Sequence, residues 1–213
     1  MVNVNLIIRR ALAVVLLSML SLGFLSISAA PKKQVQKIKV ACVGNSITYG
    51  TGIEDREHFS YPVQLQKMLG EKYQVGNFGK PGATLLNHGH RPYMQQEEFK
   101  EAMAFKGDIA VIHLGINDTD PRNWPNYRDE FVKDYLSLMD SLRSANPKVR
   151  FILARMTPIA DRHPRFISGT KLWHGEIQEA IQTVARVSGA ELIDFHAPLY
   201  PYPYLLPDAI HPN

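Results

Sequence analysis

Short apolar runs alternate with segments of helical periodicity along most of this 213-residue chain. Strands that are separated by helices pair in parallel and are joined by right-handed crossovers. The alternation therefore predicts an α/β fold, a three-layer α/β/α sandwich built around a five-stranded parallel sheet. The predicted strands are Ile38–Val43, Tyr73–Phe78, Ile109–Leu114, Arg150–Ala154 and Glu191–Phe195.

Three segments between these strands have the pattern of helices. Tyr61–Leu69 is predicted to be a short helix, with Pro62 tolerated in its first turn. Tyr127–Ala145 and Leu172–Val187 carry apolar residues on one face, as amphipathic helices do. The apolar face comprises Phe131, Tyr135, Leu138, Met139 and Leu142 in the first of these, and Ile177, Ile181 and Val184 in the second.

The N-terminal residues have the pattern of an export signal. Arg9 and Arg10 precede an apolar run from Ala11 to Leu25, and small residues follow. A charged region, an apolar region and small residues in this order are typical of a signal peptide. A membrane anchor is the alternative, but the run is shorter than the roughly 20 residues that a span requires. We expect residues 1–29 to be a signal peptide, residues 36–213 to form the domain, and the protein to be exported, either periplasmic or secreted.

Charge and cysteine content exclude some classes of partner and bond. The formal net charge is +4, two of these charges belong to the predicted signal, and no Lys/Arg-rich run follows. A nucleic-acid partner is therefore not predicted, and neither is a stable membrane span after signal cleavage. Cys42 is the only cysteine, so an internal disulfide is impossible. Its place in the first strand predicts a buried, inert thiol. The oligomeric state stays open.

Polar residues follow four of the five predicted strands. Ser46 follows the first strand, the segment 79–84 follows the second, Gly115–Asp118 follows the third, and Asp208–His211 lies in the long segment after the last. Because the carboxyl ends of parallel strands meet at one edge of the sheet, these residues are expected to lie close together. That convergence predicts a functional site.

The residue types at this edge suit nucleophilic catalysis. A serine hydroxyl such as that of Ser46 needs an adjacent base, and a histidine such as His211 can act as one near neutral pH. Asp208 precedes His211 by three residues and could orient its imidazole. Acyl transfer also needs donors for the developing oxyanion. Suitable donors are the backbone N–H groups of Ser46 and Gly82 and the side-chain amide of Asn117, with Gly79 as a competitor of Gly82.

These motifs resemble the four blocks of the SGNH (GDSL-type) hydrolases. They are Gly-Asn-Ser-Ile-Thr at residues 44–48, Gly82, Gly-Ile-Asn-Asp at residues 115–118 and Asp-Ala-Ile-His at residues 208–211, in the order of that family. The resemblance implies a flavodoxin-like sheet and no metal or organic cofactor. It also implies Ser46 as the nucleophile, His211 as the base, Asp208 as the orienting acid, and Ser46, Gly82 and Asn117 as the oxyanion hole.

The first motif also suggests a substrate class. The run Gly44–Gly50 is similar to carbohydrate esterases and sialate O-acetylesterase-like proteins of Bacteroides-type bacteria. The resemblance implies an exported serine esterase that removes O-acetyl groups from a carbohydrate. Two alternatives remain open at this point. One is a lipase or thioesterase with the same mechanism, and the other is a non-catalytic glycan-binding module on the same fold.

Two features depart from the family pattern. Asn45 stands where the family usually has aspartate, and we expect the chemistry to survive with changed local hydrogen bonds. The sequence stops at Asn213, two residues after His211. The resemblance implies a further C-terminal helix that packs on the sheet, so we expect that helix to be missing from this chain.

Other residues have both structural and functional readings. His88 and His90 could form a metal pair, but a surface loop is the preferred interpretation because no third ligand has a matching spacing. His113 is predicted to be a satisfied core residue, and Asp118 to have a structural role. The aromatic residues Trp124, Trp173 and Tyr200–Tyr204 could form a sugar-stacking platform or could serve in packing, and both readings stay open.

Overall fold

The computed structural model of the protein describes residues 36–213, so the predicted signal peptide, residues 1–29, lies outside the described residues. Five strands form one sheet in the order β2-β1-β3-β4-β5, and all neighbouring strands are parallel. This is the flavodoxin-like order. The predicted five-stranded parallel sheet is therefore confirmed. The strands are β1 (Ile38–Gly44), β2 (Tyr73–Gly79), β3 (Ile109–His113), β4 (Arg150–Arg155) and β5 (Glu191–Asp194).

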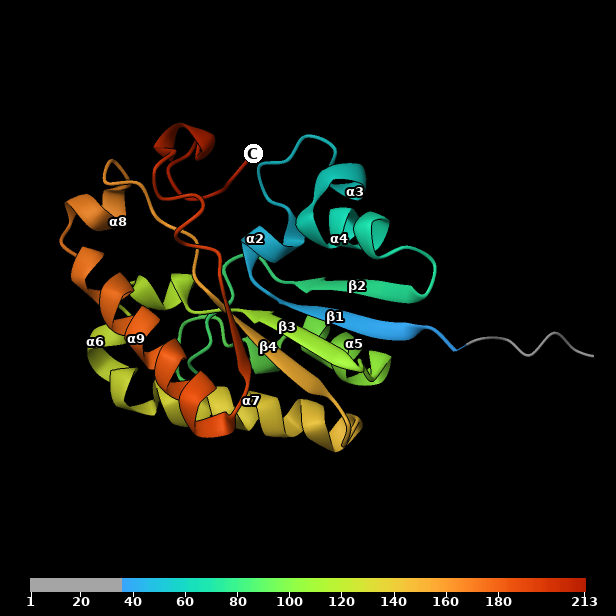
Figure 1. Ribbon diagram of the computed structural model, residues 1–213. Coiled ribbons are helices and arrows are strands. Elements are labelled where there is room, and N and C mark those ends of the chain that lie inside the picture. The colour runs from blue at the N-terminus through green and yellow to red at the C-terminus, as the bar shows by residue number, and fades with distance from the viewer. Residues whose placement is uncertain (1–35) are drawn as a thin grey trace, which may run out of the picture. The chain divides into compact units, whose positions relative to one another are not determined.

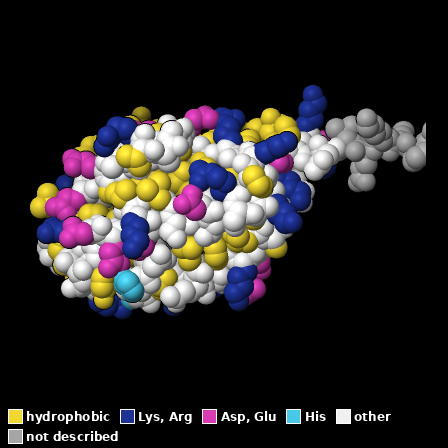
Figure 2. Space-filling model, turned by 90° about the horizontal axis from the view of Figure 1, so that it is seen from below, with side chains coloured by type: hydrophobic (Ala, Val, Ile, Leu, Met, Phe, Trp, Pro, Cys, Tyr) yellow, Lys and Arg dark blue, Asp and Glu magenta, His cyan; other side chains and the backbone are white. Residues whose placement is uncertain are grey.

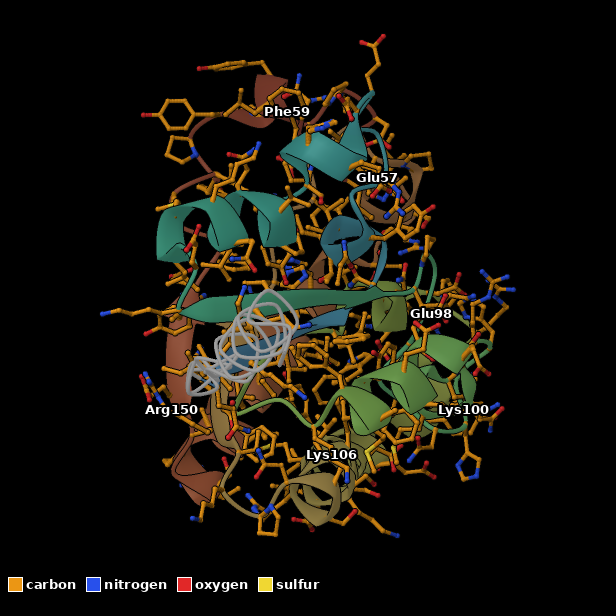
Figure 3. All side chains as sticks on the ribbon, turned by 90° about the vertical axis from the view of Figure 1, so that its right-hand side faces the viewer. Glu57, Phe59, Glu98, Lys100, Lys106 and Arg150 are labelled. Carbon is orange, nitrogen blue, oxygen red and sulfur yellow. The ribbon has the colours of Figure 1, made fainter. Side chains whose placement is uncertain are left out.

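Helices cover both faces of the sheet (Figure 1). On one face lie α3 (Arg56–Phe59) and α4 (Tyr61–Leu69), and on the other lie α5 (Glu97–Phe105), α7 (Phe131–Ala145) and α9 (Lys171–Ser188). Figure 3 shows the same layers from the side, with α5 and its labelled Glu98 and Lys100 below the sheet. The short helices and 3₁₀ turns are α2 (Ser46–Tyr49), η1 (Tyr93–Gln95), η2 (Ile116–Thr119), α6 (Trp124–Tyr127), η3 (Arg128–Glu130), α8 (Pro164–Ile167) and η4 (Pro203–Leu205).

The predicted apolar faces of the two long helices form the main core. Phe131 and Tyr135 of α7 and Ile177 and Ile181 of α9 are fully buried, and they pack in one cluster with Ile112 of β3. The helix predicted to begin at residue 127 begins four residues later, because a 3₁₀ turn occupies residues 128–130. Helix α5 was not predicted. Ala102 is its only fully buried residue, and Phe99, Met103 and Phe105 pack partly buried against the main core.

The opposite face of the sheet carries a smaller core beside α4. Val40, Cys42 and Val111 are buried there. Burial raises the pKa of the Cys42 thiol to about 12, and this effect is larger than the opposite effect of a hydrogen bond with Tyr61. The thiol is therefore buried and protonated at neutral pH, as its place in the first strand predicted.

An apolar groove of about 680 Å³ lies next to α4 on this face. Its lining includes Leu65 and Leu69 of α4, Ile152 of β4 and Ile193 of β5. Nothing among residues 36–213 shows what covers this groove. That a C-terminal helix is missing from this chain therefore stays a prediction. None of the helices in residues 36–213 is long and apolar enough to cross a membrane.

The surface on the side of α7 mixes charges of both signs. Figure 2 shows Lys and Arg side chains interspersed with Asp and Glu on this face, with small apolar patches between them. Neither sign of charge forms a large continuous patch on this face.

The end of β1 passes very close to helix α2. A Cβ atom at Gly44 would lie 2.0 Å from Thr48 Oγ1 and 2.8 Å from the carbonyl oxygen of His113. Glycine at this position therefore lets α2 begin directly at the end of the strand, which places Ser46 at the carboxyl edge of the sheet. The C-terminal segment also reaches this edge, near α2 (Figure 1).

Substitution of Gly44 tests this close approach. We expect Gly44→Ala to lower the free energy of unfolding by about 1–3 kcal/mol, because the added methyl overpacks the turn. Gly175→Ala is the matched control. It lies inside α9 with nothing within 4 Å of its added methyl, so it should raise stability by about 1 kcal/mol. Urea unfolding measures both, and equal effects at the two glycines would contradict this account.

Candidate active site

Ser46 lies at the start of helix α2, where the turn after β1 fixes its side chain. Asn45 caps the helix, its Oδ1 accepting a hydrogen bond from the N–H of Ile47 at 3.0 Å. Ser46 is 7% exposed. Its Oγ lies 2.8 Å from Nε2 of His211. The structure therefore brings together a serine and a histidine that lie on opposite ends of the described chain.

Asp208 and His211 form a local turn that orients the imidazole. Asp208 Oδ2 lies 2.5 Å from His211 Nδ1, and Oδ1 accepts hydrogen bonds from the N–H groups of Ile210 at 3.1 Å and His211 at 2.8 Å. Burial alone would raise the pKa of Asp208, but these hydrogen bonds outweigh it and hold the pKa below its ordinary value. An ionised Asp208 accepts a hydrogen bond from the N–H group at Nδ1, which leaves the lone pair of Nε2 free to accept the hydroxyl proton of Ser46.

Two of the three candidate oxyanion donors, Gly82 and Asn117, lie on neighbouring loops that are joined by a hydrogen bond. Asn117 Nδ2 donates a hydrogen bond of 2.9 Å to the carbonyl oxygen of Ala83. Gly82, directly before Ala83, has a φ of +77°, a backbone conformation that favours glycine. The N–H of Gly79 already donates to Oδ1 of Asn77 at 3.0 Å. That bond favours Gly82 over Gly79 as the second backbone donor.

Asp118 connects the same two loops through its carboxylate. Its two carboxylate oxygens accept hydrogen bonds from the N–H groups of Leu85 and Leu86, each at 2.9 Å. Burial raises the pKa of Asp118 to about 7, although these backbone hydrogen bonds lower it. The nearby charge of Asp134 adds to the rise. The structural role that was predicted for Asp118 is therefore one of connecting the second and third loops.

Asn45 makes only part of the contacts available to its side chain. Its Oδ1 caps α2, as an aspartate oxygen could, but its Nδ2 is buried and has no hydrogen-bond partner among residues 36–213. The changed hydrogen-bond pattern expected at this position is thus an unpaired donor beside the serine.

The histidines outside the Ser46 site form no metal centre in the described part of the chain, where no group of three or more His, Cys, Asp and Glu could hold an ion. His88 Nδ1 contacts Glu130 Oε2 at 2.7 Å, and His90 contacts Asn123. His113 is fully buried, as predicted. It is only half satisfied, because Nε2 accepts from the N–H of Thr157 while Nδ1 lacks a partner among residues 36–213.

The aromatic residues fall into two groups. Trp124 is 4% exposed and donates from Nε1 to Glu176, and Trp173 packs against the core. Both tryptophans therefore serve in packing. Tyr200, Tyr202 and Tyr204 are exposed, so only these three residues remain available for stacking on a ligand.

One element of the site was not anticipated from the motifs, namely the loop after β4. The N–H of Ala160 in this loop donates a hydrogen bond of 2.8 Å to the carbonyl oxygen of Ala209, between Asp208 and His211. Ala160, Leu206 and Ala209 also pack together in a small apolar cluster. The position of this loop, after a parallel strand, is the signal that could have indicated its contribution.

Comparison with known proteins agrees with this geometry. The profile of the GDSL-like lipase/acylhydrolase family matches residues 42–213. An acetylxylan esterase of Xylanibacter ruminicola is 39% identical over 204 residues, which cover 86% of this chain and 41% of that protein. The chain thus spans about two fifths of the length of this relative. The predicted resemblance to the GDSL-type hydrolases is confirmed by the family match.

Solved structures share the fold at low sequence identity. A protein from Parabacteroides merdae ATCC 43184 that is assigned to the GDSL-like lipases superposes with a TM-score of 0.63 at 17% identity, covering 86% of this chain and 92% of that one. The acetyl xylan esterase AlAXEase superposes with a TM-score of 0.53 at 19% identity, covering 83% and 92%. These likenesses confirm the predicted fold.

The raised pKa of Asp118 predicts a pH-dependent contribution to stability. Between its ordinary pKa of 3.8 and about 7, the folded state keeps a proton that the unfolded state has released. The free energy of unfolding should therefore fall as pH rises through this window, by on the order of 1 kcal/mol per pH unit. Asp118→Asn removes this dependence.

The measurement is urea unfolding of the wild type and Asp118→Asn between pH 4 and 7. The stability of the wild type relative to this variant should decrease steadily with pH. Asp140→Asn, at an exposed carboxylate of α7, is the control and should follow the wild type. Parallel curves for the wild type and Asp118→Asn would contradict the raised pKa.

Proposed function

Because this chain belongs to the GDSL-like lipase/acylhydrolase family, we propose that it is a serine esterase that removes O-acetyl groups from a carbohydrate. The observation that carries the catalytic part of the proposal is the continuous chain of hydrogen bonds from Ser46 through His211 to Asp208. A non-catalytic glycan-binding module would not need such an arrangement.

In the first half of the proposed reaction, the ester is cleaved and an acyl-enzyme forms. Ser46 Oγ attacks the ester carbonyl carbon while His211 Nε2 takes the hydroxyl proton, and Asp208 stabilises the resulting imidazolium. The N–H groups of Ser46 and Gly82 and the amide of Asn117 donate hydrogen bonds to the oxyanion, each worth about 3 kcal/mol. The bond to the alcohol oxygen then breaks, and His211 returns the proton to the departing alcohol.

In the second half, water replaces the alcohol. His211 takes a proton from the water as its oxygen attacks the acyl carbon, and the same donors stabilise the second oxyanion. The bond to Ser46 Oγ breaks, the proton returns to the serine, and the free acid leaves. This sequence uses only side chains and backbone groups of the described site.

The substrate class rests on similarity. The relative from Xylanibacter ruminicola is an acetylxylan esterase and shares 39% of the aligned residues with this chain. A small acyl group on a glycan is therefore the preferred substrate, with longer acyl esters as the alternative within the same mechanism. The exposed Tyr200, Tyr202 and Tyr204, on the segment that also carries Asp208, offer aromatic faces to a sugar.

We also propose that the protein is exported, to the periplasm or the exterior. The pattern of residues 1–29, with Arg9 and Arg10 before an apolar run, supports this location. A polymeric glycan is itself met outside the cytoplasm, so the proposed substrate and the proposed location are consistent with each other.

Removal of the candidate nucleophile tests the mechanism. Ser46→Ala should lower kcat for p-nitrophenyl acetate by about 10⁴-fold or more, because the acyl-enzyme can no longer form. Ser144→Ala, at an exposed serine in the last turn of α7, is the matched control and should hydrolyse the ester at the wild-type rate. Equal rates for Ser46→Ala and the wild type would show that Ser46 is not the nucleophile.

A comparison of substrates tests the proposed specificity. Wild-type protein should release acetate from acetylated xylan or an O-acetylated sialic acid with a higher kcat/KM than it shows on p-nitrophenyl esters of long-chain acids. Acetate release and p-nitrophenol release measure the two activities. A preference for the long-chain esters would reject carbohydrate deacetylation and favour a lipase.

A further inference from the structure

Two arginines lie around the start of α8, and each contacts a different part of the candidate active site. These residues, Arg162 and Arg165, flank His163 and Pro164 in the sequence. His163 caps α8, its Nδ1 accepting a hydrogen bond of 3.2 Å from the N–H of Arg165. Because Pro164 also fixes the first turn of this helix, the two arginines project from a locally defined backbone.

Arg165 contacts the loop that carries Asn117. Its Nη1 donates to the carbonyl oxygen of Ile116 at 3.3 Å and to Thr119 Oγ1 at 3.5 Å. These two acceptors lie on either side of Asn117, within the single 3₁₀ turn η2. Arg165 therefore adds two contacts to the turn that carries the candidate oxyanion donor, beside the hydrogen bond from Asn123 to the carbonyl oxygen of Asn117.

Arg162 contacts the segment that carries Asp208 and His211. Its Nη1 donates to the carbonyl oxygen of Pro203 at 3.2 Å, and its Nη2 donates to the carbonyl oxygen of Leu206. Ala209, between the acid and the base, has a φ of +73°, which non-glycine residues rarely adopt. Such a backbone persists only where surrounding contacts enforce it, and Arg162 supplies two of those contacts just before it.

We propose that Arg162 and Arg165 are positioning residues, and that the segment 162–165 at the start of α8 sets the distance between the acid–base pair and the oxyanion donor. Arg162 acts through Asp208 and His211, and Arg165 acts through Asn117. Neither arginine has a hydrogen bond to Ser46, Asp208 or His211, so both would act on the reacting atoms through other residues. This inference rests on the proposed hydrolysis at Ser46.

The arginines should affect the chemical step more than substrate binding. Displacing a catalytic group by about 1 Å can lower a rate on the order of a hundredfold. Arg162→Ala and Arg165→Ala should each lower kcat for p-nitrophenyl acetate by about tenfold to a hundredfold, with KM unchanged. Arg162→Lys should recover part of the loss, because an ammonium group can still donate to one of the two carbonyl oxygens.

Double-mutant cycles distinguish this role from general destabilisation. Arg162→Ala should have little further effect on kcat in an Asp208→Asn protein, because the group that it positions is already impaired. Arg165→Ala should likewise have little further effect in an Asn117→Ala protein. The crossed pairs, Arg162→Ala with Asn117→Ala and Arg165→Ala with Asp208→Asn, should give losses closer to the product of the single effects.

Hydrogen exchange tests the same inference without using activity. Mass spectrometry of Arg162→Ala should show faster amide exchange confined to residues 203–213, and Arg165→Ala should show it at residues 116–120. Arg186→Ala, an exposed arginine in the last turn of α9, is the control and should change neither segment nor kcat. Circular dichroism shows whether each variant is folded before the comparison.

The outcomes separate this inference from the proposed function. Segment-specific exchange together with non-additive kinetics in the matched pairs supports the positioning role. Unchanged exchange in both segments overturns it, whatever the activity of the protein. Multiplicative losses in all four pairs overturn it as well, while leaving hydrolysis at Ser46 intact. Absence of hydrolysis by the wild type would instead reject the proposed function, and the exchange data would still decide whether the arginines hold the two segments.

Discussion

The hydrogen bond between Ser46 Oγ and His211 Nε2 is the contact on which the rest of the candidate site depends. It joins residues that are 165 positions apart. The serine is delivered by β1, which lies inside the sheet between β2 and β3. The histidine follows β5, the strand at one edge. The C-terminal segment must therefore cross the ends of β4 and β3 to reach Ser46, and its contacts with the β4 loop hold it along this path.

Other features of the site serve this one contact. The close approach at Gly44 starts α2 at the end of β1, and the cap from Asn45 fixes its first turn. Asp208 holds the imidazole from the far side. Asp118 and Asn117 tie the second and third loops to each other, so that the candidate oxyanion donors share one support. The functional groups come from separate loops, and hydrogen bonds join the second loop to the third and the β4 loop to the C-terminal segment.

The sequence predicts the inner strands β1 and β3 because strands buried in a parallel sheet consist of nearly continuous apolar residues. It predicts the edge strands β2 and β5 from shorter apolar segments that alternate with helices. It predicts α7 and α9 because each buries a long apolar face. Helix α5 is only nine residues long and was not predicted, although Phe99 and Met103 pack partly buried against the core. The candidate triad could be predicted because serine, histidine and aspartate occur in motifs of fixed spacing. Arg162 and Arg165 could not, since they bind mainly backbone carbonyl oxygens, which every residue provides. The sequence likewise could not predict that Nδ1 of His113 lacks a hydrogen-bond partner, because this depends on packing between distant residues.

Covalent labelling of the candidate nucleophile is the most direct test of the central claim. Only a serine that is activated by a base reacts rapidly with diisopropyl fluorophosphate, because its oxygen must attack phosphorus and displace fluoride. Mass spectrometry of digested protein should find one adduct, on the peptide that contains Ser46, formed rapidly in the wild type and much more slowly in His211→Ala. Absence of the adduct, or rapid labelling of a different serine, would contradict the account.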